Sequence, residues 1–177
     1  EQHPHRRTEP QDLELHELQQ LADILMHLAG ADDSLDEAVA ALDDLIQRYP
    51  NMAAPLKLKK SELYARFDQM EPAFELMAEL HSGGYTDQKL LNNLATVHQI
   101  RGELDQALGV FDEGYKKFPG NETLFRNYLS LLMETGQFTR ARGLIEHSLF
   151  AEQPDMKYLR AMALAEAGVT LVLNARG

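Results

Sequence analysis

Apolar residues recur at intervals of three and four along most of the chain, and polar residues fill the positions between them. Leu35, Ala38, Leu42 and Leu45 give one such series, and comparable series follow as far as position 167. This period places apolar side chains on one face of an α-helix, whereas a half-buried strand would alternate at every second residue. The pattern predicts an all-α protein built from amphipathic helices.

The helical pattern repeats every 34 residues. Ala73, Ala107 and Ala141 stand at one position of the repeat. A fixed period of this length is typical of a stack of similar helical units, each of which buries its apolar face against its neighbours. The same offset relates four further triplets: Ser61, Ala95 and Leu129; Tyr64, His98 and Leu132; Met70, Leu104 and Phe138; and Met77, Phe111 and Ile145.

A turn residue separates the two apolar series of each unit. Gly102 and Gly136 take this position, and Asp68 takes it in the preceding unit. Each unit is therefore predicted to contain two antiparallel helices. Pro119 and Pro154 are predicted to close units, because proline cannot continue a helix.

The pattern resembles the tetratricopeptide repeat (TPR) family, and the unit 88–121 resembles it most fully. The resemblance implies a right-handed superhelical array of antiparallel helix pairs, an α-solenoid. His98 stands where the family has an aromatic residue, and Leu129 stands where it has a small one, so local repacking is expected there. The matching residues of the unit are Leu91, Leu94, Ala95, Gly102, Leu104, Ala107, Phe111, Gly114 and Pro119.

The spacing divides the chain into a flexible segment 1–12, a TPR-like repeat domain 13–168 and a C-terminal tail 169–177. We expect the chain to be a fragment or a processed form. The apolar stretch 169–173 is interpreted as the start of a missing helix, in preference to an exposed end or a segment that docks on another copy. The predicted units of the domain are 18–51, 54–87, 88–121, 122–155 and a partial unit 156–168.

The resemblance implies that the first helix of each pair lines a concave binding surface. The residues placed there by register are polar, rich in amides and locally cationic, and Glu62 and Met133 share their register. Such a surface would bind a peptide or protein segment. The predicted groove residues are Lys59, Arg66, Asn92, Asn93, Thr96, Gln99, Arg126, Asn127 and Ser130.

Asn93 and Asn127 occupy the same position of successive units. A carboxamide offers one acceptor and two donors, so two of them could pair with the main chain of an extended peptide. The pair resembles the asparagine ladder of superhelical TPR proteins, although asparagine could also be a tolerated polar residue there. A clamp for a C-terminal carboxylate is disfavoured, because Leu58 and Glu62 stand where the family's clamp has lysine and asparagine.

The composition excludes several classes of function. The 177 residues include no cysteine, which excludes disulfides, thiolate zinc sites and a cysteine nucleophile. The net charge of -11 argues against nucleic-acid binding. Twelve acidic and three basic residues lie within 1–53, whereas the remainder holds sixteen and fourteen. No stretch approaches the roughly 18 apolar residues of a membrane span.

The sequence contains no recognised catalytic or metal-binding motif. Seven histidines are present, none in a ligand spacing such as HExxH, and His98 is predicted to be partly buried in the core. A copper site at His3 is disfavoured. The acidic run 31–37 is interpreted as a helix start with Ser34 and Glu37 as a capping box, not as a calcium loop. We expect no metal, no cofactor and no catalytic residue.

We predict a noncatalytic scaffold or adaptor that binds a peptide or protein segment in its concave groove. The alternatives are a repeat module that recruits or regulates a catalytic domain within a larger signalling, secretion or glycosyl-transfer protein, and a secretion chaperone. The expected partner is another protein, with no nucleic acid and no membrane insertion. A homo-oligomer could form through the open C-terminal end. The compartment is not fixed, with the cytoplasm favoured over the periplasm.

Overall fold

The computed structural model describes residues 20–21, 23–24, 27 and 35–174. Within these residues the chain is helical, with no strand, and consecutive helices pack in pairs. The predicted all-α class is therefore confirmed. The chain divides into two compact units, 1–86 and 87–177, which are described separately.

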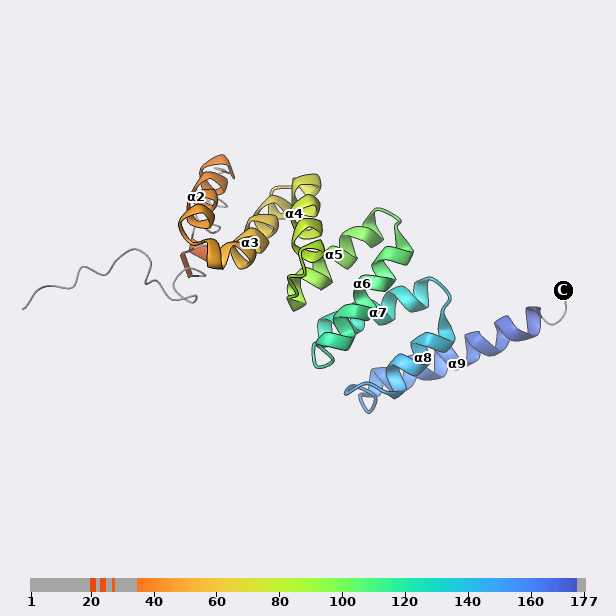
Figure 1. Ribbon diagram of the computed structural model, residues 1–177. Coiled ribbons are helices and arrows are strands. Elements are labelled where there is room, and N and C mark those ends of the chain that lie inside the picture. The colour runs from red at the N-terminus through yellow and green to blue at the C-terminus, as the bar shows by residue number, and fades with distance from the viewer. Residues whose placement is uncertain (1–19, 22, 25–26, 28–34, 175–177) are drawn as a thin grey trace, which may run out of the picture. The chain divides into compact units, whose positions relative to one another are not determined.

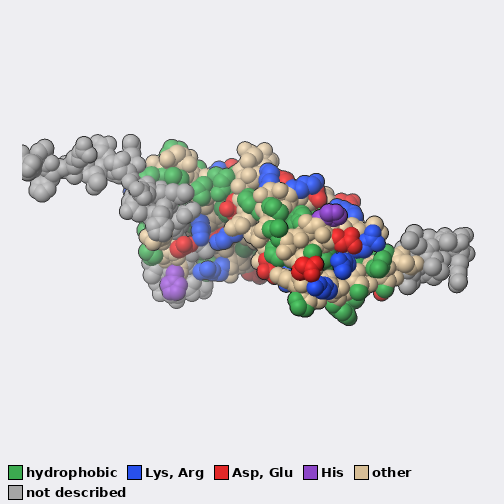
Figure 2. All heavy atoms as spheres, turned by 90° about the horizontal axis from the view of Figure 1, so that it is seen from below, with side chains coloured by type: hydrophobic (Ala, Val, Ile, Leu, Met, Phe, Trp, Pro, Cys, Tyr) green, Lys and Arg blue, Asp and Glu red, His purple; other side chains and the backbone are tan. Residues whose placement is uncertain are grey.

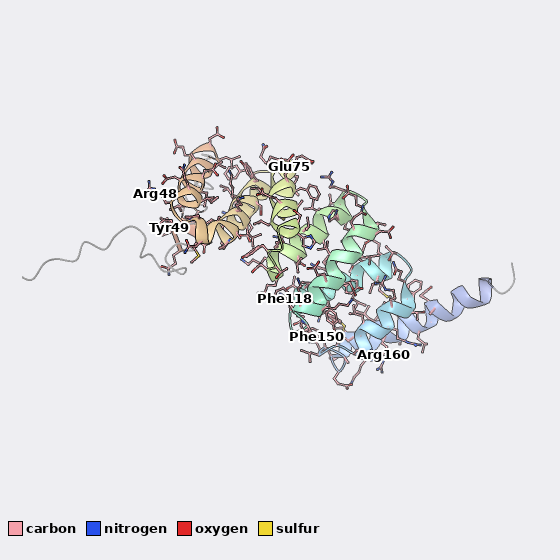
Figure 3. The ribbon with its side chains drawn as sticks, in the orientation of Figure 1. Arg48, Tyr49, Glu75, Phe118, Phe150 and Arg160 are labelled. Atoms are coloured by element: carbon pink, nitrogen blue, oxygen red, sulfur yellow. The ribbon has the colours of Figure 1, made fainter. Side chains whose placement is uncertain are left out.

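From residue 35 onward the described part of the first unit forms three α-helices and one turn of 3-10 helix (Figure 1), and residues 20–21, 23–24 and 27 are also helical. Its bounds are Leu35–Arg48 for α2, Pro50–Met52 for η1, Ala53–Arg66 for α3 and Met70–Ser82 for α4. Tyr49 lies between α2 and η1 and is buried (Figure 3). It joins a core formed by Ala38, Leu42, Leu45, Leu56 and Leu63.

Asp68 forms the turn between α3 and α4. Its φ is +59°, in the left-handed region, where Gly102 and Gly136 also lie with φ values of +75° and +71°. Aspartate tolerates this region better than most residues, because its short polar side chain can bond to the nearby backbone. The prediction that Asp68 replaces the turn glycine is confirmed.

The second unit contains five helices between residues 87 and 174 (Figure 1). Asp87 caps the first, since its carboxylate accepts hydrogen bonds from the backbone N–H groups of Lys89 (2.7 Å) and Leu90 (3.2 Å). Such caps satisfy amides that have no partner within the helix. The bounds are Gln88–Ile100 for α5, Leu104–Lys117 for α6, Glu122–Glu134 for α7, Phe138–Glu146 for α8 and Pro154–Asn174 for α9.

Small residues allow the helices of this unit to approach closely. Ala95 on α5 and Ala107 on α6 are fully buried. Gly114 is also buried, and a Cβ atom there would lie 2.8 Å from Cδ1 of Leu124 on α7. Aromatic rings complete the core, and Phe150, in the segment between α8 and α9, packs on Phe125 with ring centroids 4.8 Å apart (Figure 3).

The prediction that Pro154 closes the preceding unit is wrong. Helix α8 already ends at Glu146, where the His147 ring and the Ser148 hydroxyl bond to backbone carbonyls of the last turn at 2.8 Å each. Pro154 instead begins α9. Proline suits the first turn of a helix, because the N–H that it lacks would have no helical partner there.

The preferred interpretation of 169–173, the start of a separate helix, is also wrong. Helix α9 continues without a turn from Pro154 to Asn174. The turn residues Gly102 and Gly136 would be followed, one period later, by Thr170, and a β-branched residue disfavours a positive φ. The residues past the predicted partial unit therefore extend the same helix.

Other expectations concern residues outside those described. They include the segment 1–12, the copper site at His3 and the Ser34 half of the capping box.

The two glycines of α6 give a matched test of close packing. Gly114→Ala is expected to lower the free energy of unfolding by about 1–2 kcal/mol, because the added methyl group meets the fully buried Leu124 and Leu91. Gly109→Ala is expected to raise it by about 0.5–1 kcal/mol, because the added methyl group meets nothing within 4 Å and alanine favours helix. Urea unfolding followed by circular dichroism measures both. Equal effects of the two changes would contradict the close approach at Gly114.

Candidate functional site

Three carboxamides meet on the face formed by α5 and α7. Nδ2 of Asn127 on α7 donates to Oδ1 of Asn92 on α5 at 2.8 Å. Nδ2 of Asn92 lies 3.5 Å from Oδ1 of its neighbour Asn93, which is a long and weak hydrogen bond. All three side chains are half-buried. The residues that we predicted as two parallel rungs, Asn93 and Asn127, are thus connected through Asn92.

Two of these amides, Asn92 and Asn93, line a polar notch of about 260 Å³. A second amide pair closes one side of it, since Nδ2 of Asn121 donates to Oε1 of Gln88 at 2.9 Å. Asn121 is held in turn as the cap of α7, where its Oδ1 accepts from the backbone N–H of Leu124. The notch is lined by Gln88, Lys89, Asn92, Asn93, Asn121 and Thr123.

The two other predicted residues of α5 have their own internal partners. The hydroxyl of Thr96 donates to the carbonyl of Asn92 at 2.8 Å, one turn earlier in the same helix. Nε2 of Gln99 donates to Oε2 of Glu134 on α7 at 2.8 Å. Gln99 therefore joins the two helices at the opposite end from the Asn121–Gln88 pair.

Arg126 holds α7 to the start of α9. Its guanidinium donates to Oε1 of Glu122 (2.8 Å), Oδ2 of Asp155 (2.7 Å) and Oε1 of Gln153 (2.9 Å). The hydrogen bond to Asp155 is the main cause that raises the pKa of Arg126, and the same bond lowers the pKa of Asp155 below its ordinary value. Both groups are therefore charged at neutral pH.

The expectation of a locally cationic surface is wrong. Arg126 lies between two carboxylates, and Lys59 in the first unit lies 2.6 Å from Asp23 and 3.7 Å from Glu62. Burial alone would lower the pKa of Lys59, but the hydrogen bond to Asp23 and the charge of Glu62 outweigh it and raise the pKa. Lys and Arg side chains lie beside Asp and Glu side chains on the face drawn in Figure 2.

The first unit holds the remaining two predicted residues. Lys59 and Arg66 both lie on α3, and Arg66 is exposed at the end of that helix. The predicted groove residues thus fall into two groups, and the second unit brings together Asn92, Asn93, Thr96, Gln99, Arg126, Asn127 and Ser130.

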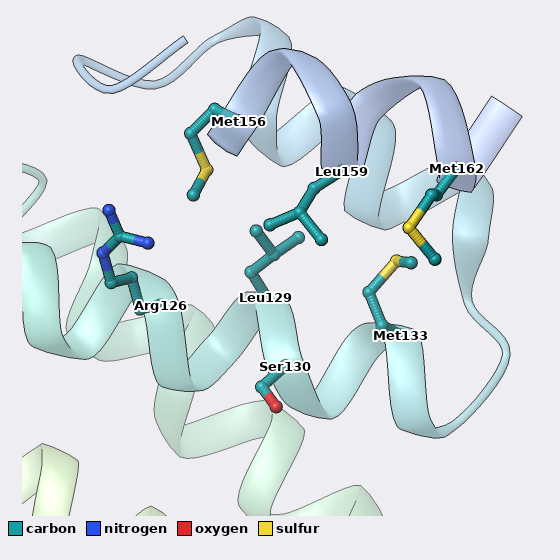
Figure 4. Close-up of a pocket in the computed structure, with 7 residues that line it drawn as sticks. All are labelled: Arg126, Leu129, Ser130, Met133, Met156, Leu159 and Met162. Carbon is teal, nitrogen blue, oxygen red and sulfur yellow. The ribbon is translucent and has the colours of Figure 1, made fainter. Parts of the chain in front are cut away.

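An apolar pocket of about 320 Å³ lies between α7 and α9 (Figure 4). Leu129 points toward Leu159 across it, and Met133 points toward Met162. Leu129, the bulky residue at the family's small position, is buried here at 3% exposure. The pocket is lined by Arg126, Leu129, Ser130, Met133, Met156, Leu159 and Met162.

The sequence analysis missed the residues that α9 contributes to this pocket. Met156, Leu159 and Met162 recur every three residues, which indicates a shared helix face. We treated this segment as an incomplete unit, so the register that selected Arg126 and Ser130 was not extended to it. The spacing of three residues between Met156, Leu159 and Met162 could have identified this face from the sequence.

His98 is partly buried, as predicted. Its Nδ1 lies 2.6 Å from Oε2 of Glu103, which joins the end of α5 to the turn before α6. This hydrogen bond is the main cause that lowers the pKa of Glu103. The pair lies at the α5–α6 turn and lines neither the polar notch nor the apolar pocket.

The described part of the chain holds no group of three or more His, Asp or Glu side chains that could bind a metal ion. None of the helices described here combines the length and the hydropathy that crossing a membrane requires.

Paired helices of 34-residue period, with a left-handed residue at each internal turn and small residues at the closest contacts, define a tetratricopeptide repeat protein. Specifically, the chain belongs to the family described as Psidin, N-terminal TPR repeats region, which matches residues 32–164. The predicted resemblance is confirmed. No curated protein matches the chain significantly.

Solved structures share the fold. A tetratricopeptide repeat protein from Parabacteroides merdae matches with a TM-score of 0.66 and 15% identity, over 84% of this chain and 61% of that one. The TPR-like repeats of a putative kinesin light chain from Podospora anserina match with a TM-score of 0.59 and 14% identity, over 88% of this chain and 90% of that one. At these identities the likeness shows the fold alone. The chain spans less than two thirds of the Parabacteroides protein.

The Arg126–Asp155 pair can be tested by titration. Arg126→Gln is expected to raise the pKa of Asp155 toward its ordinary value, because the main cause of the shift is removed. The folded-state pKa is depressed, so the pair stabilises the fold above the ordinary carboxylate pKa, and this contribution disappears as the pH falls through the lowered value. Carboxyl ¹³C NMR measures the pKa directly.

Lys157→Gln is the matched control for this titration. Lys157 bonds to Glu152 at 2.9 Å and lowers the pKa of that residue. The control should therefore raise the pKa of Glu152 and leave that of Asp155 unchanged. If the pKa of Asp155 does not respond to Arg126→Gln, the ion pair between Arg126 and Asp155 is contradicted.

Proposed function

We propose that this TPR module binds an extended segment of a partner protein on the face formed by α5 and α7, and that it does so without catalysis. TPR modules generally mediate protein–protein interaction, and the family assignment places the chain among them. To this general role the proposal adds which face binds, that recognition is by hydrogen bonds to the main chain, and that the ligand is an extended segment. It applies equally if the chain is one module of a longer protein.

The observation that carries the proposal is the row of carboxamides at Asn127, Asn92 and Asn93. Only one donor of Asn127 is used by its bond to Asn92. Within the described residues, no hydrogen bond takes a donor from Nδ2 of Asn93. The row therefore presents donors and acceptors together, which is what the alternating N–H and C=O groups of an extended peptide require.

The row is also held in place before any ligand arrives. Asn127 and Asn92 bond directly, while the Asn121–Gln88 and Gln99–Glu134 pairs join α5 to α7 on either side. A site that is ordered in advance loses less conformational entropy on binding. We therefore expect main-chain recognition by a fixed surface, with little dependence on the side chains of the segment that lies over the amides.

The proposed binding residues of this unit are those that the sequence predicted, with different roles. Asn92, Asn93 and Asn127 bind the ligand main chain, while Gln99 joins α5 to α7 and Thr96 bonds within α5. Arg126 fixes α9 beside α7, and Ser130 lies at the edge of the apolar pocket. Lys59 and Arg66 lie in the first unit and remain predicted contacts.

A displayed library of random dodecapeptides, selected on the immobilised 177-residue chain, supplies ligands for the test. The selected peptides are synthesised with a fluorescent label, and their affinities are measured by anisotropy. Asn93→Ala combined with Asn127→Ala is expected to weaken binding roughly 5- to 150-fold, since two lost hydrogen bonds contribute about 1–3 kcal/mol. Methylation of the peptide's backbone nitrogens should weaken binding as well.

Asn51→Ala is the matched control, because Asn51 is exposed and lies in the first unit. It should leave the affinity unchanged, and thermal unfolding should show that all variants are folded. If the double variant binds as tightly as the control, or if side-chain changes weaken binding while backbone methylation does not, the proposal is wrong.

A further inference from the structure

The apolar pocket between α7 and α9 is large enough for one bulky side chain. An apolar cavity of about 150 Å³ holds a benzene molecule, and this pocket measures about 320 Å³. It opens to solvent at Met162, which is 38% exposed, and at the exposed Ser130. A side chain could therefore enter without any movement of the helices.

Helix α9 packs mainly on α8, and its fully buried Ala163 does not line the pocket. Met156, which is also fully buried, lines the pocket at the start of α9. Leu159 and Met162 lie opposite Leu129 and Met133 across the pocket (Figure 4). Three methionines line the space, and their unbranched, flexible side chains adapt to ligands of different shape.

Arg126 is the only charged residue that lines the pocket, but carboxylates outnumber cations among the residues next to that lining. At one end, Glu122 and Asp155 flank the single guanidinium of Arg126. At the other end, Glu134 follows Met133 and is exposed. The rim therefore favours a cationic ligand and disfavours a carboxylate beside the pocket.

The cations in the first half of α9 do not cancel this excess. Lys157 bonds to Glu152, and Arg160 also acts on Glu152 and helps to lower its pKa. Glu152 offsets one of these two positive charges, so one carboxylate remains in excess around the pocket. Lys157, Arg160 and Glu152 do not line the pocket.

The pocket and the amide row share helix α7. Asn127 follows Arg126 on α7, and the pocket residues Ser130 and Met133 lie three and six residues further along that helix. At 1.5 Å per residue this is about 4.5–9 Å, which an extended peptide covers in roughly one to three residues.

We propose that the pocket selects the partner segment by its side chains: it binds one large apolar residue, such as leucine, methionine or phenylalanine, flanked by lysine or arginine. The occupant is an extended segment of another protein, with its anchor one to three residues from the part held by the amides. This inference rests on the proposed function, because it assigns the specificity of the same binding face.

The same peptide selection tests the inference. Selected peptides should share an apolar anchor with adjacent basic residues. Met162→Asp should weaken a synthetic selected peptide at least tenfold, since it places a charge where the anchor binds. Leu164→Asp is the matched control, because Leu164 is also an exposed apolar residue of α9, 55% exposed, but does not line the pocket. The control should retain wild-type affinity.

Two peptide variants separate the contributions of shape and charge. Replacing the anchor by serine should weaken wild-type binding at least tenfold and should have little further effect on Met162→Asp. Replacing the flanking basic residues by glutamate should weaken binding as well, and added salt should weaken the parent peptide. Thermal unfolding confirms that the protein variants are folded.

The outcomes distinguish this inference from the proposed function. If the double asparagine variant weakens binding but Met162→Asp does not, the pocket assignment is overturned and the main-chain site stands. If the selected peptides are acidic or lack a common anchor, the assignment is also overturned. If no peptide is selected, both proposals fail.

Discussion

The structure depends on the close approach of helices at small residues. Ala73, Ala107 and Ala141 are each fully buried at the same position of successive repeats, so the second helix of each pair can lie directly on the first. A helix in this fold has no sheet behind it and must bury its apolar face on neighbouring helices. Because each helix pair meets this requirement in the same way, the small and apolar residues recur every 34 positions. Where a residue departs from this period, the packing changes.

The polar residues on the first helix of each pair do not belong to the apolar core, but they form hydrogen bonds with one another. On α5 and α7 the amides bond across the helices, and Arg126 of α7 is shared among Glu122, Asp155 and Gln153. The same contacts fix the spacing of the helices and arrange the surface. The face is therefore rigid where it is polar and adaptable where methionine lines it, which suits a site that holds a main chain firmly and accepts several anchors.

Much of the fold could be predicted from the sequence, because the period, the turn residues and the apolar spacing are local signals. Asp68 was identified as a turn from register alone. The end of α8 was not, because it depends on side-chain bonds from His147 and Ser148 to the last turn. The site was predicted less well. Register placed the asparagines on one face, but the neutralisation of Arg126 by Asp155, 29 residues away, depends on how α9 packs.

The lengths of the last two helices bear on the cooperativity of unfolding. Helix α8 has 9 residues and α9 has 21, or about 14 Å against about 32 Å at 1.5 Å per residue. Even if α8 packed along α9 over its whole length, it would contact less than half of the length of α9. Stability in a repeat array comes largely from contacts between adjacent helices, so the distal turns of α9 receive less support from α8 than the first turns do. The bonds of Arg126 to Gln153 and Asp155 lie at the start of α9, so they should persist when the distal turns of that helix unwind.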